Sequence, residues 1–252
     1  ASGATFDVSG MNGGSYSLAN GQTLKGNGSL KGDLIVASGA AVEPGTSIGT
    51  LTFSSDNLTF SAGSTLRVEV NRSPSPTADK IQGIATLTSG GTLEVINIGA
   101  ALEVNDSFTL LSASTRSGEF GAISPANTNS DPELAWDKPA LKGSGVLKVH
   151  HVPYATNQTV VRAQGTTAKI KLSELFPSLD PLDADTVVLE SFTAGSQGAM
   201  ISSNATYLFY VPANDNDDAF DYTVVDSRGE KRTRTITVSV QPVTGQAQRI
   251  TV

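Results

Sequence analysis

Short apolar segments separated by glycine fill the first part of the chain and limit its fold more than any other feature. Between Ser17 and Val70, alternating runs such as Leu51 to Phe53 and Leu66 to Val70 recur about every 8 residues or fewer. A parallel sheet covered by helices needs connections of a dozen or more residues, so this spacing excludes an α/β fold. Two all-β arrangements remain: the hairpins of a sandwich and the coils of a solenoid.

The composition of the repeated segments favours the coil. Leu34 to Gly39, Leu51 to Gly63 and Leu87 to Gly91 share one theme, an apolar strand followed by polar residues and a glycine turn. A solenoid is stabilised by stacking each coil on the next, and it needs small residues at its corners. The chain therefore predicts stacked strands in its first half, with a core built mainly of Leu, Val, Ile and Ala.

One segment also resembles a known family. Val42 to Phe53, which contains Pro-Gly-Thr-Ser-Ile-Gly-Thr-Leu, and Leu58 to Val70 resemble the autotransporter-associated β-strand repeat. The likeness continues through Ala78 to Val95 and Leu134 to Val149, so it spans roughly residues 17–150. The resemblance implies a right-handed parallel β-helix displayed at the bacterial surface, structural or adhesive in role, and it brings no catalytic residues.

The spacing of the apolar segments changes near His150 to Pro153. The strands predicted beyond this point lie about 10 to 20 residues apart, which is the rhythm of a β-sandwich. Ser173 to Phe176 is expected to form one short helical turn that ends at Pro177. We therefore divide the chain into residues 1–151, a parallel β-helix with a closing loop region, and residues 152–252, a β-sandwich.

The second half resembles bacterial cadherin-like, immunoglobulin-like repeats. The matching stretches are Ile170 to Val187 and Tyr210 to Val240, within a region of about residues 157–241. Ser178-Leu179 stands where the family has Asn-Asp, and Asp183-Ala184-Asp185 stands where it has Asp-Gly-Asp. The predicted fold class is thus all-β, a right-handed parallel β-solenoid segment followed by an immunoglobulin-like β-sandwich.

Residues 124–140 are rich in Asn, Pro and Ser, and we expect a long loop there. It contains Trp136, the single tryptophan. Its ring is interpreted as a lid over the end of the aliphatic core, with a sugar-stacking platform as the alternative.

Two acidic clusters are the candidate metal sites. Asp180, Asp183 and Asp185 form the first, and Asp217 and Asp218, with Asp215 and Asp221 beside them, form the second. Clustered carboxylates in a loop suit Ca²⁺, although neither cluster has the spacing of an EF-hand. The competing interpretation is a pair of solvated acidic loops. Structural calcium is the one cofactor predicted.

No catalytic motif is present. The two histidines, His150 and His151, are adjacent, so on a strand they point to opposite faces and cannot bind one metal together. There is no cysteine and no Gly-x-Ser-x-Gly turn. The acids of the first half are spread singly, and Glu69 and Glu94 are expected to face outward. The chain is therefore predicted not to be an enzyme.

The charge balance bears on the partners. Charged residues make up 16% and the net charge is −7, so nucleic acid, which requires a basic surface, is not expected to bind. No apolar run approaches the length of a membrane span. We predict a non-catalytic structural or adhesive module, extracellular or on a bacterial surface and part of a longer chain, with a polysaccharide or cell-surface ligand. The alternative is an accessory, carbohydrate-associated region of a polysaccharide-degrading enzyme.

Overall fold

The computed structural model describes residues 3–11, 13–73, 77–125 and 131–242. The chain divides into two compact units, Ala1–His150 and His151–Val252. Their regular structure is almost all β, with 54% of residues in strands and 4% in helices over the chain. Among the described residues, no helix is long and apolar enough to cross a membrane.

The first unit consists of short strands, most of which hydrogen-bond to strands far along the sequence. Its elements are β1 (Ala4–Asp7), β2 (Ser15–Leu18), β3 (Thr23–Gly26), β4 (Gly28–Lys31), β5 (Asp33–Val36), β6 (Ala41–Pro44), β7 (Thr50–Phe53), β8 (Leu58–Phe60), β9 (Thr65–Val70), β10 (Lys80–Ser89), β11 (Thr92–Asn97), β12 (Ser107–Thr109), β13 (Leu111–Gly118), β14 (Ala122–Ser124), β15 (Leu134–Trp136), α1 (Lys138–Ser144) and β16 (Val146–His151).

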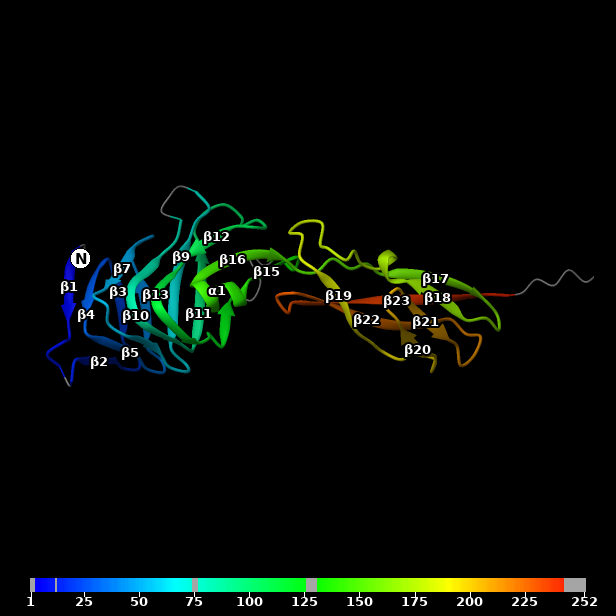
Figure 1. Ribbon diagram of the computed structural model, residues 1–252, viewed down its shortest axis with the longest axis horizontal. Coiled ribbons are helices and arrows are strands. Elements are labelled where there is room, and N and C mark those ends of the chain that lie inside the picture. The colour runs from blue at the N-terminus through cyan, green and yellow to red at the C-terminus, as the bar shows by residue number, and fades with distance from the viewer. Residues whose placement is uncertain (1–2, 12, 74–76, 126–130, 243–252) are drawn as a thin grey trace, which may run out of the picture. The chain divides into compact units, whose positions relative to one another are not determined.

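These strands line up in three parallel columns (Figure 1). One column runs β1-β4-β7 and ends on the first residues of β10; the second runs β2-β5-β8 and ends on the last residues of β10. The third is β3-β6-β9-β11-β14, and β13 pairs with β10 along its length. Every pair in the columns is parallel, so these strands do not form hairpins with their sequence neighbours.

The core lies on one face of each column because side chains alternate along a strand. In β9, Leu66, Val68 and Val70 are buried, whereas the residues between them are partly exposed. Where β10 passes from one column to the next, Gly83 has φ +74°, and a Cβ there would lie 2.2 Å from the Phe53 carbonyl oxygen. This crowded, left-handed position therefore requires glycine.

The last part of the first unit differs from the predicted long loop. Within residues 124–140 the described chain forms β15, and α1 begins at Lys138. Asp137 caps this helix by accepting a hydrogen bond from the Ala140 N–H at 2.7 Å, and Pro139 lies in its first turn. Trp136 is 2% exposed within the core cluster, so its ring cannot stack on a sugar.

The second unit is a sandwich of two sheets. Its strands are β17 (Gln158–Ala163), β18 (Ala168–Lys171), β19 (Val187–Phe192), β20 (Met200–Ser203), β21 (Tyr207–Val211), β22 (Asp218–Asp226) and β23 (Lys231–Gln241), with a short 3-10 turn at Leu172–Glu174. One sheet has the order β17-β23-β22-β19 and the other β18-β21-β20. A separate cluster of buried residues forms its core, and stacked aromatic pairs such as Tyr210 with Phe220 belong to it.

Candidate functional site

The first acidic cluster lies in the loop between β18 and β19, and Asp180 is its buried centre. Its side chain is 2% exposed. One oxygen accepts the Leu182 N–H at 2.9 Å. The other accepts the Tyr154 N–H at 2.8 Å and the His151 Nδ1 at 2.9 Å. Burial by itself raises the pKa of Asp180, but these hydrogen bonds outweigh it and lower the pKa below its usual value.

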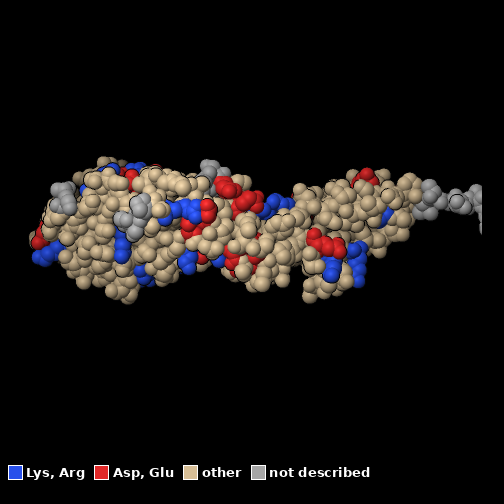
Figure 2. All heavy atoms as spheres, turned by 90° about the horizontal axis from the view of Figure 1, so that it is seen from above, with Lys and Arg blue, Asp and Glu red and all other residues tan. Residues whose placement is uncertain are grey.

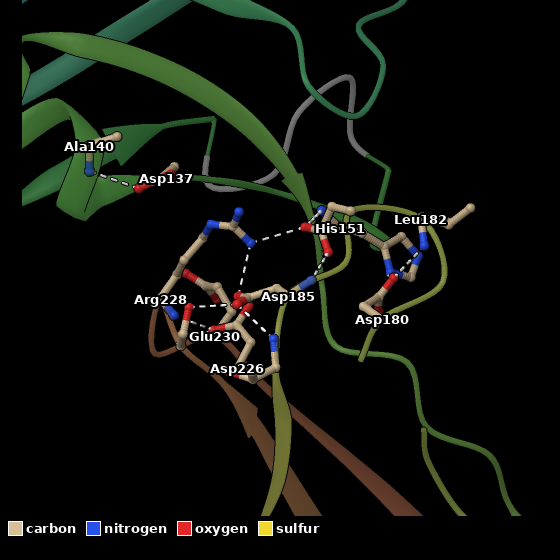
Figure 3. Close-up of polar contacts among 12 residues, drawn as sticks. Asp137, Ala140, His151, Asp180, Leu182, Asp185, Asp226, Arg228 and Glu230 are labelled. Atoms are coloured by element: carbon tan, nitrogen blue, oxygen red, sulfur yellow. Dashed lines mark hydrogen bonds and ion pairs between the residues drawn. The ribbon is translucent and has the colours of Figure 1, made fainter. Parts of the chain in front are cut away.

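The other two carboxylates of this cluster are held by one arginine (Figure 3). Arg228 donates from Nη1 to Asp183 at 3.0 Å and to Asp185 at 2.9 Å. Asp185 also accepts the Ser227 hydroxyl at 2.6 Å, and Asp183 accepts the His151 N–H at 3.1 Å. Burial raises the pKa of Asp185, but the Ser227 hydroxyl and the neighbouring donors bring it below its ordinary value. We call Asp180, Asp183, Asp185, His151 and Arg228 the acidic clasp.

The second acidic cluster separates into single carboxylates with different partners. Asp218 is 4% exposed and accepts the Tyr210 hydroxyl at 2.8 Å and the Ser196 hydroxyl at 2.7 Å. Burial, followed by the bond to Asp218, raises the pKa of Tyr210 to about 12. Asp217 is exposed and accepts the Val240 N–H at 2.7 Å. The remaining members, Asp215 and Asp221, accept from Arg162 and Thr235.

These contacts bear on the predicted calcium sites. The oxygens of Asp180, Asp183, Asp185, Asp217 and Asp218 accept hydrogen bonds from donors of the chain itself. Within the described residues, no group of three or more His, Asp or Glu side chains is arranged to hold a metal ion. Calcium at either cluster stays a prediction. The solvated-loop interpretation does not fit Asp180 and Asp218, because both carboxylates are buried.

Sequence reasoning overlooked the basic partners of these acids. Arg228 lies in the turn between β22 and β23 and pairs with both Asp183 and Asp185. Arg162 is 3% exposed and donates to Asp215 and to the Asn214 carbonyl. His151, which the sequence does not link to any acid, contacts Asp180. The sequence does contain many aspartates and a few arginines in this unit, which suggests ion pairs. It does not indicate which aspartate pairs with which arginine.

The acids of the first unit are less isolated than the sequence predicted. On the outer face of the third column, Lys25, Glu43, Arg67 and Glu94 come from β3, β6, β9 and β11. Lys25 pairs with Glu43 at 2.9 Å, Arg67 pairs with Glu43, and Arg67 pairs with Glu94 at 2.8 Å. Charges of alternating sign thus follow the column. On the face shown in Figure 2, charged residues are few and uncharged residues dominate.

Asp79 is a buried acid of the first unit that contacts the backbone of Glu69, one of the acids predicted to face outward. Asp79 is 3% exposed and accepts the Gly49 N–H at 2.8 Å and the Glu69 N–H at 2.7 Å. Burial is the main reason that the pKa of Asp79 rises to about 6. Glu69 is only partly exposed, and its Oε2 is buried without a hydrogen-bond partner in the described structure. Both oxygens of Asp79 fasten backbone, which is a structural role.

Comparison with known proteins adds one family. A search of curated proteins finds no match. A solved structure of a nucleoside hydrolase-related hypothetical protein from Saccharophagus degradans, associated with carbohydrate metabolism, is similar at 21% identity. That match covers 36% of this chain and 25% of the other, and with a TM-score of 0.27 it supports no conclusion about fold or function. Residues 150–239, which contain the strands of the sandwich from β17 into β23, match the family model of the bacterial Ig domain.

Proposed function

We propose that this chain is a non-catalytic structural or adhesive module of a bacterial surface or secreted protein. The observation that carries the proposal is the bacterial Ig domain match over residues 150–239. Domains of this kind are commonly extracellular and typically belong to larger proteins. Neither unit needs a disulfide, since each has its own extended apolar core.

The proposal assigns the first unit as a right-handed parallel β-solenoid segment, similar to autotransporter passengers. The three parallel columns support it, because successive trios of strands, β1 to β3, β4 to β6 and β7 to β9, each add one strand to every column. In such a stack each layer is stabilised by its neighbours, which gives a stiff spacer. A spacer joined to a bacterial Ig domain suits display of a binding surface.

The non-catalytic assignment rests on how the buried acids are used. Asp180, Asp218 and Asp79 each accept two or more hydrogen bonds from the chain. A general acid or base needs a proton that it exchanges with substrate, and these oxygens are instead committed to holding loops and strands.

A groove in the first unit favours a second candidate, a carbohydrate-associated accessory region. Its volume is about 440 Å³, and it crosses neighbouring parallel strands. Hydroxyl, amide and carboxylate groups line it, together with Leu34 and the exposed Ile35: Ser15, Asp33, Asn57, Thr59, Thr86 and Thr88. Parallel strands repeat about every 4.8 Å, so these groups form regular rows along which a glycan chain can lie.

A binding screen tests both candidates. The purified chain is incubated with soluble and insoluble polysaccharides, in calcium and in chelator, beside the double variant Asn57→Ala/Thr88→Val. The matched control is Thr23→Val, an exposed strand threonine outside the groove. Glycan binding that the double variant loses would favour the accessory role. No binding by a folded chain would leave the structural module.

The calcium arm of the same screen is independent of glycan binding. Calcium bound by the acidic clasp or by Asp217 and Asp218 would raise the melting temperature relative to chelator, because a ligand that binds only the folded state stabilises it. An unchanged melting temperature would remove calcium from the proposal.

A further inference from the structure

A cavity of about 570 Å³ opens in the second unit beside the edge strand β19. Its lining comes from the turn after β18, from β19 and from the connection between β20 and β21: Lys171, Leu172, Ser173, Phe176, Ser178, Val187, Val188, Leu189, Ser203, Asn204, Ala205 and Thr206. β19 and β20 are the outer strands of their sheets, so the cavity is bounded by residues at or next to two sheet edges. Its volume lies within the range of ligand sites.

The edge of β19 retains backbone groups that can bond to another strand. One side of β19 pairs with β22. On the other side, the Val187 N–H donates to the Ser178 carbonyl at 3.1 Å, and a single bridge joins Leu179 to Thr186. Because N–H and C=O groups alternate in direction along an antiparallel strand, the Leu189 N–H and the Val187 C=O point to this same outer side. The chain's own short pairing ends there.

The cavity has an apolar part, made of Leu172, Phe176 and residues 187–189, beside serine, threonine and asparagine side chains and one lysine. Phe176 and Val187 are buried beneath the cavity, whereas Val188 is 55% exposed. Lys171 is exposed at the rim and forms no ion pair within the described residues. Exposed apolar residues on strand edges are ordinarily avoided unless a partner covers them.

We propose that an extended peptide adds as a strand to the outer edge of β19, with apolar side chains in the cavity and an acidic side chain at Lys171. The Leu189 N–H and the Val187 C=O select a peptide, because a backbone supplies the complementary acceptor and donor. An acyl chain would leave both groups without partners. The bulge between Leu189 and Ser191 ends the regular edge, so the added strand is short.

The test uses a displayed library of random peptides about eight residues long, a length that spans the cavity in extended form. Selected peptides are synthesised, and their dissociation constants are measured against the full chain. We expect alternating apolar residues with a nearby Asp or Glu. Lys171→Glu should weaken these peptides about fivefold, as for reversal of an exposed charge pair. The matched control, Lys148→Glu, changes another exposed strand lysine and should leave the affinity unchanged.

Two further measurements separate strand addition from binding to the apolar surface alone. Ala205→Trp fills the cavity from an exposed position, so it should abolish binding without unfolding the unit. N-methylation of alternate peptide amides should abolish binding in one alternate set and spare the other, because only every second N–H faces β19. Equal binding of both N-methylated sets, or binding that survives Ala205→Trp, would overturn the proposal, as would a selection that enriches no peptide.

Discussion

The two units bury their interiors in different ways. The first unit pairs parallel strands whose inward residues are mainly aliphatic, and four of its charged residues form an outer row along the third column: Lys25, Glu43, Arg67 and Glu94. Both units bury acids, Asp79 in the first and Asp180 and Asp218 in the second, but the buried arginines of the described residues, Arg162 and Arg232, both lie in the second unit. Each hydrogen bond described for Arg162, Asp180 and Asp218 joins a specific pair of groups, which a repeated stack does not require.

The comparison teaches where each unit is vulnerable. In the first unit's stack of parallel strands, most buried side chains are aliphatic, so the main cost of a substitution there is lost apolar volume. In the sandwich, removing one carboxylate leaves several buried donors without acceptors. The following predictions test this contrast, in order of decreasing effect.

The largest effect is expected from a cavity in the stack. Leu93 is 0% exposed on β11, which lies between β9 and β14 in the third column, and Leu93→Ala should lower the free energy of unfolding by about 3 to 4 kcal/mol. The loss in unfolding free energy is measured by urea unfolding, with hydrogen exchange as the readout for each unit separately. Ile35→Ala, at a position 39% exposed, is the control. Equal losses from both variants would break the contrast by showing that burial does not set the cost.

Removal of the central carboxylate of the acidic clasp comes next. Asp180→Ala leaves the donors of His151, Tyr154 and Leu182 without their acceptor, and should destabilise the second unit by about 2 to 3 kcal/mol. Thermal unfolding measures the loss. Asp217→Ala removes an exposed carboxylate that accepts a hydrogen bond from the Val240 N–H, and should cost less than about 1 kcal/mol. An Asp180→Ala variant that unfolds at the wild-type temperature would mean that the acidic clasp contributes nothing to stability.

The folding stability of the first unit should depend on pH because of Asp79. Its pKa of about 6 in the folded state exceeds the ordinary value of 3.8, so the folded state keeps a proton that the unfolded state has lost. Stability should therefore fall by on the order of 2 kcal/mol as pH rises from about 4 through 6. A carboxyl with a lowered pKa, such as that of Asp180, stabilises the folded state when ionised. Its contribution to folding stability is therefore lost only on the acid side of this window, as the group becomes protonated.

Asp79→Asn isolates that contribution. The amide meets one of the two backbone N–H donors with its own N–H, so some stability is lost at every pH. The slope between about pH 4 and pH 6 should nevertheless disappear in urea midpoints of the first unit. A variant that keeps the wild-type slope would assign the pH dependence to another group.

The smallest effect is expected on the outer charged row of the stack. Arg67 is 39% exposed and pairs with Glu43 and Glu94, and Arg67→Gln should cost only ~0.5 kcal/mol because solvent screens the pairs. Unfolding at low and high salt checks this, since salt should remove most of the difference. A loss as large as that of Leu93→Ala would mean that the stack depends on its outer charges.

Much of the local structure was predictable from the sequence. The alternation of Leu66, Val68 and Val70 predicted a strand and its buried face, and β9 has both. Local signals were missed at α1, where Asp137 and Pro139 mark a helix start within a Ser- and Pro-rich segment. The strand β20 was also missed, because Met200 to Ser203 has one strongly β-forming residue and exposed positions.

By itself, the sequence determined that the chain is all-β, with two stretches of different rhythm and acids concentrated near Asp180 and Asp218. These features depend on neighbouring residues and on side-chain alternation, which any short segment reveals. Only the tertiary structure decided which donor each acid meets, that Asp79 is buried, and that an edge of β19 lies beside a cavity. Such pairs join residues far apart along the chain, and strand register and loop closure bring them together, neither of which a local pattern encodes.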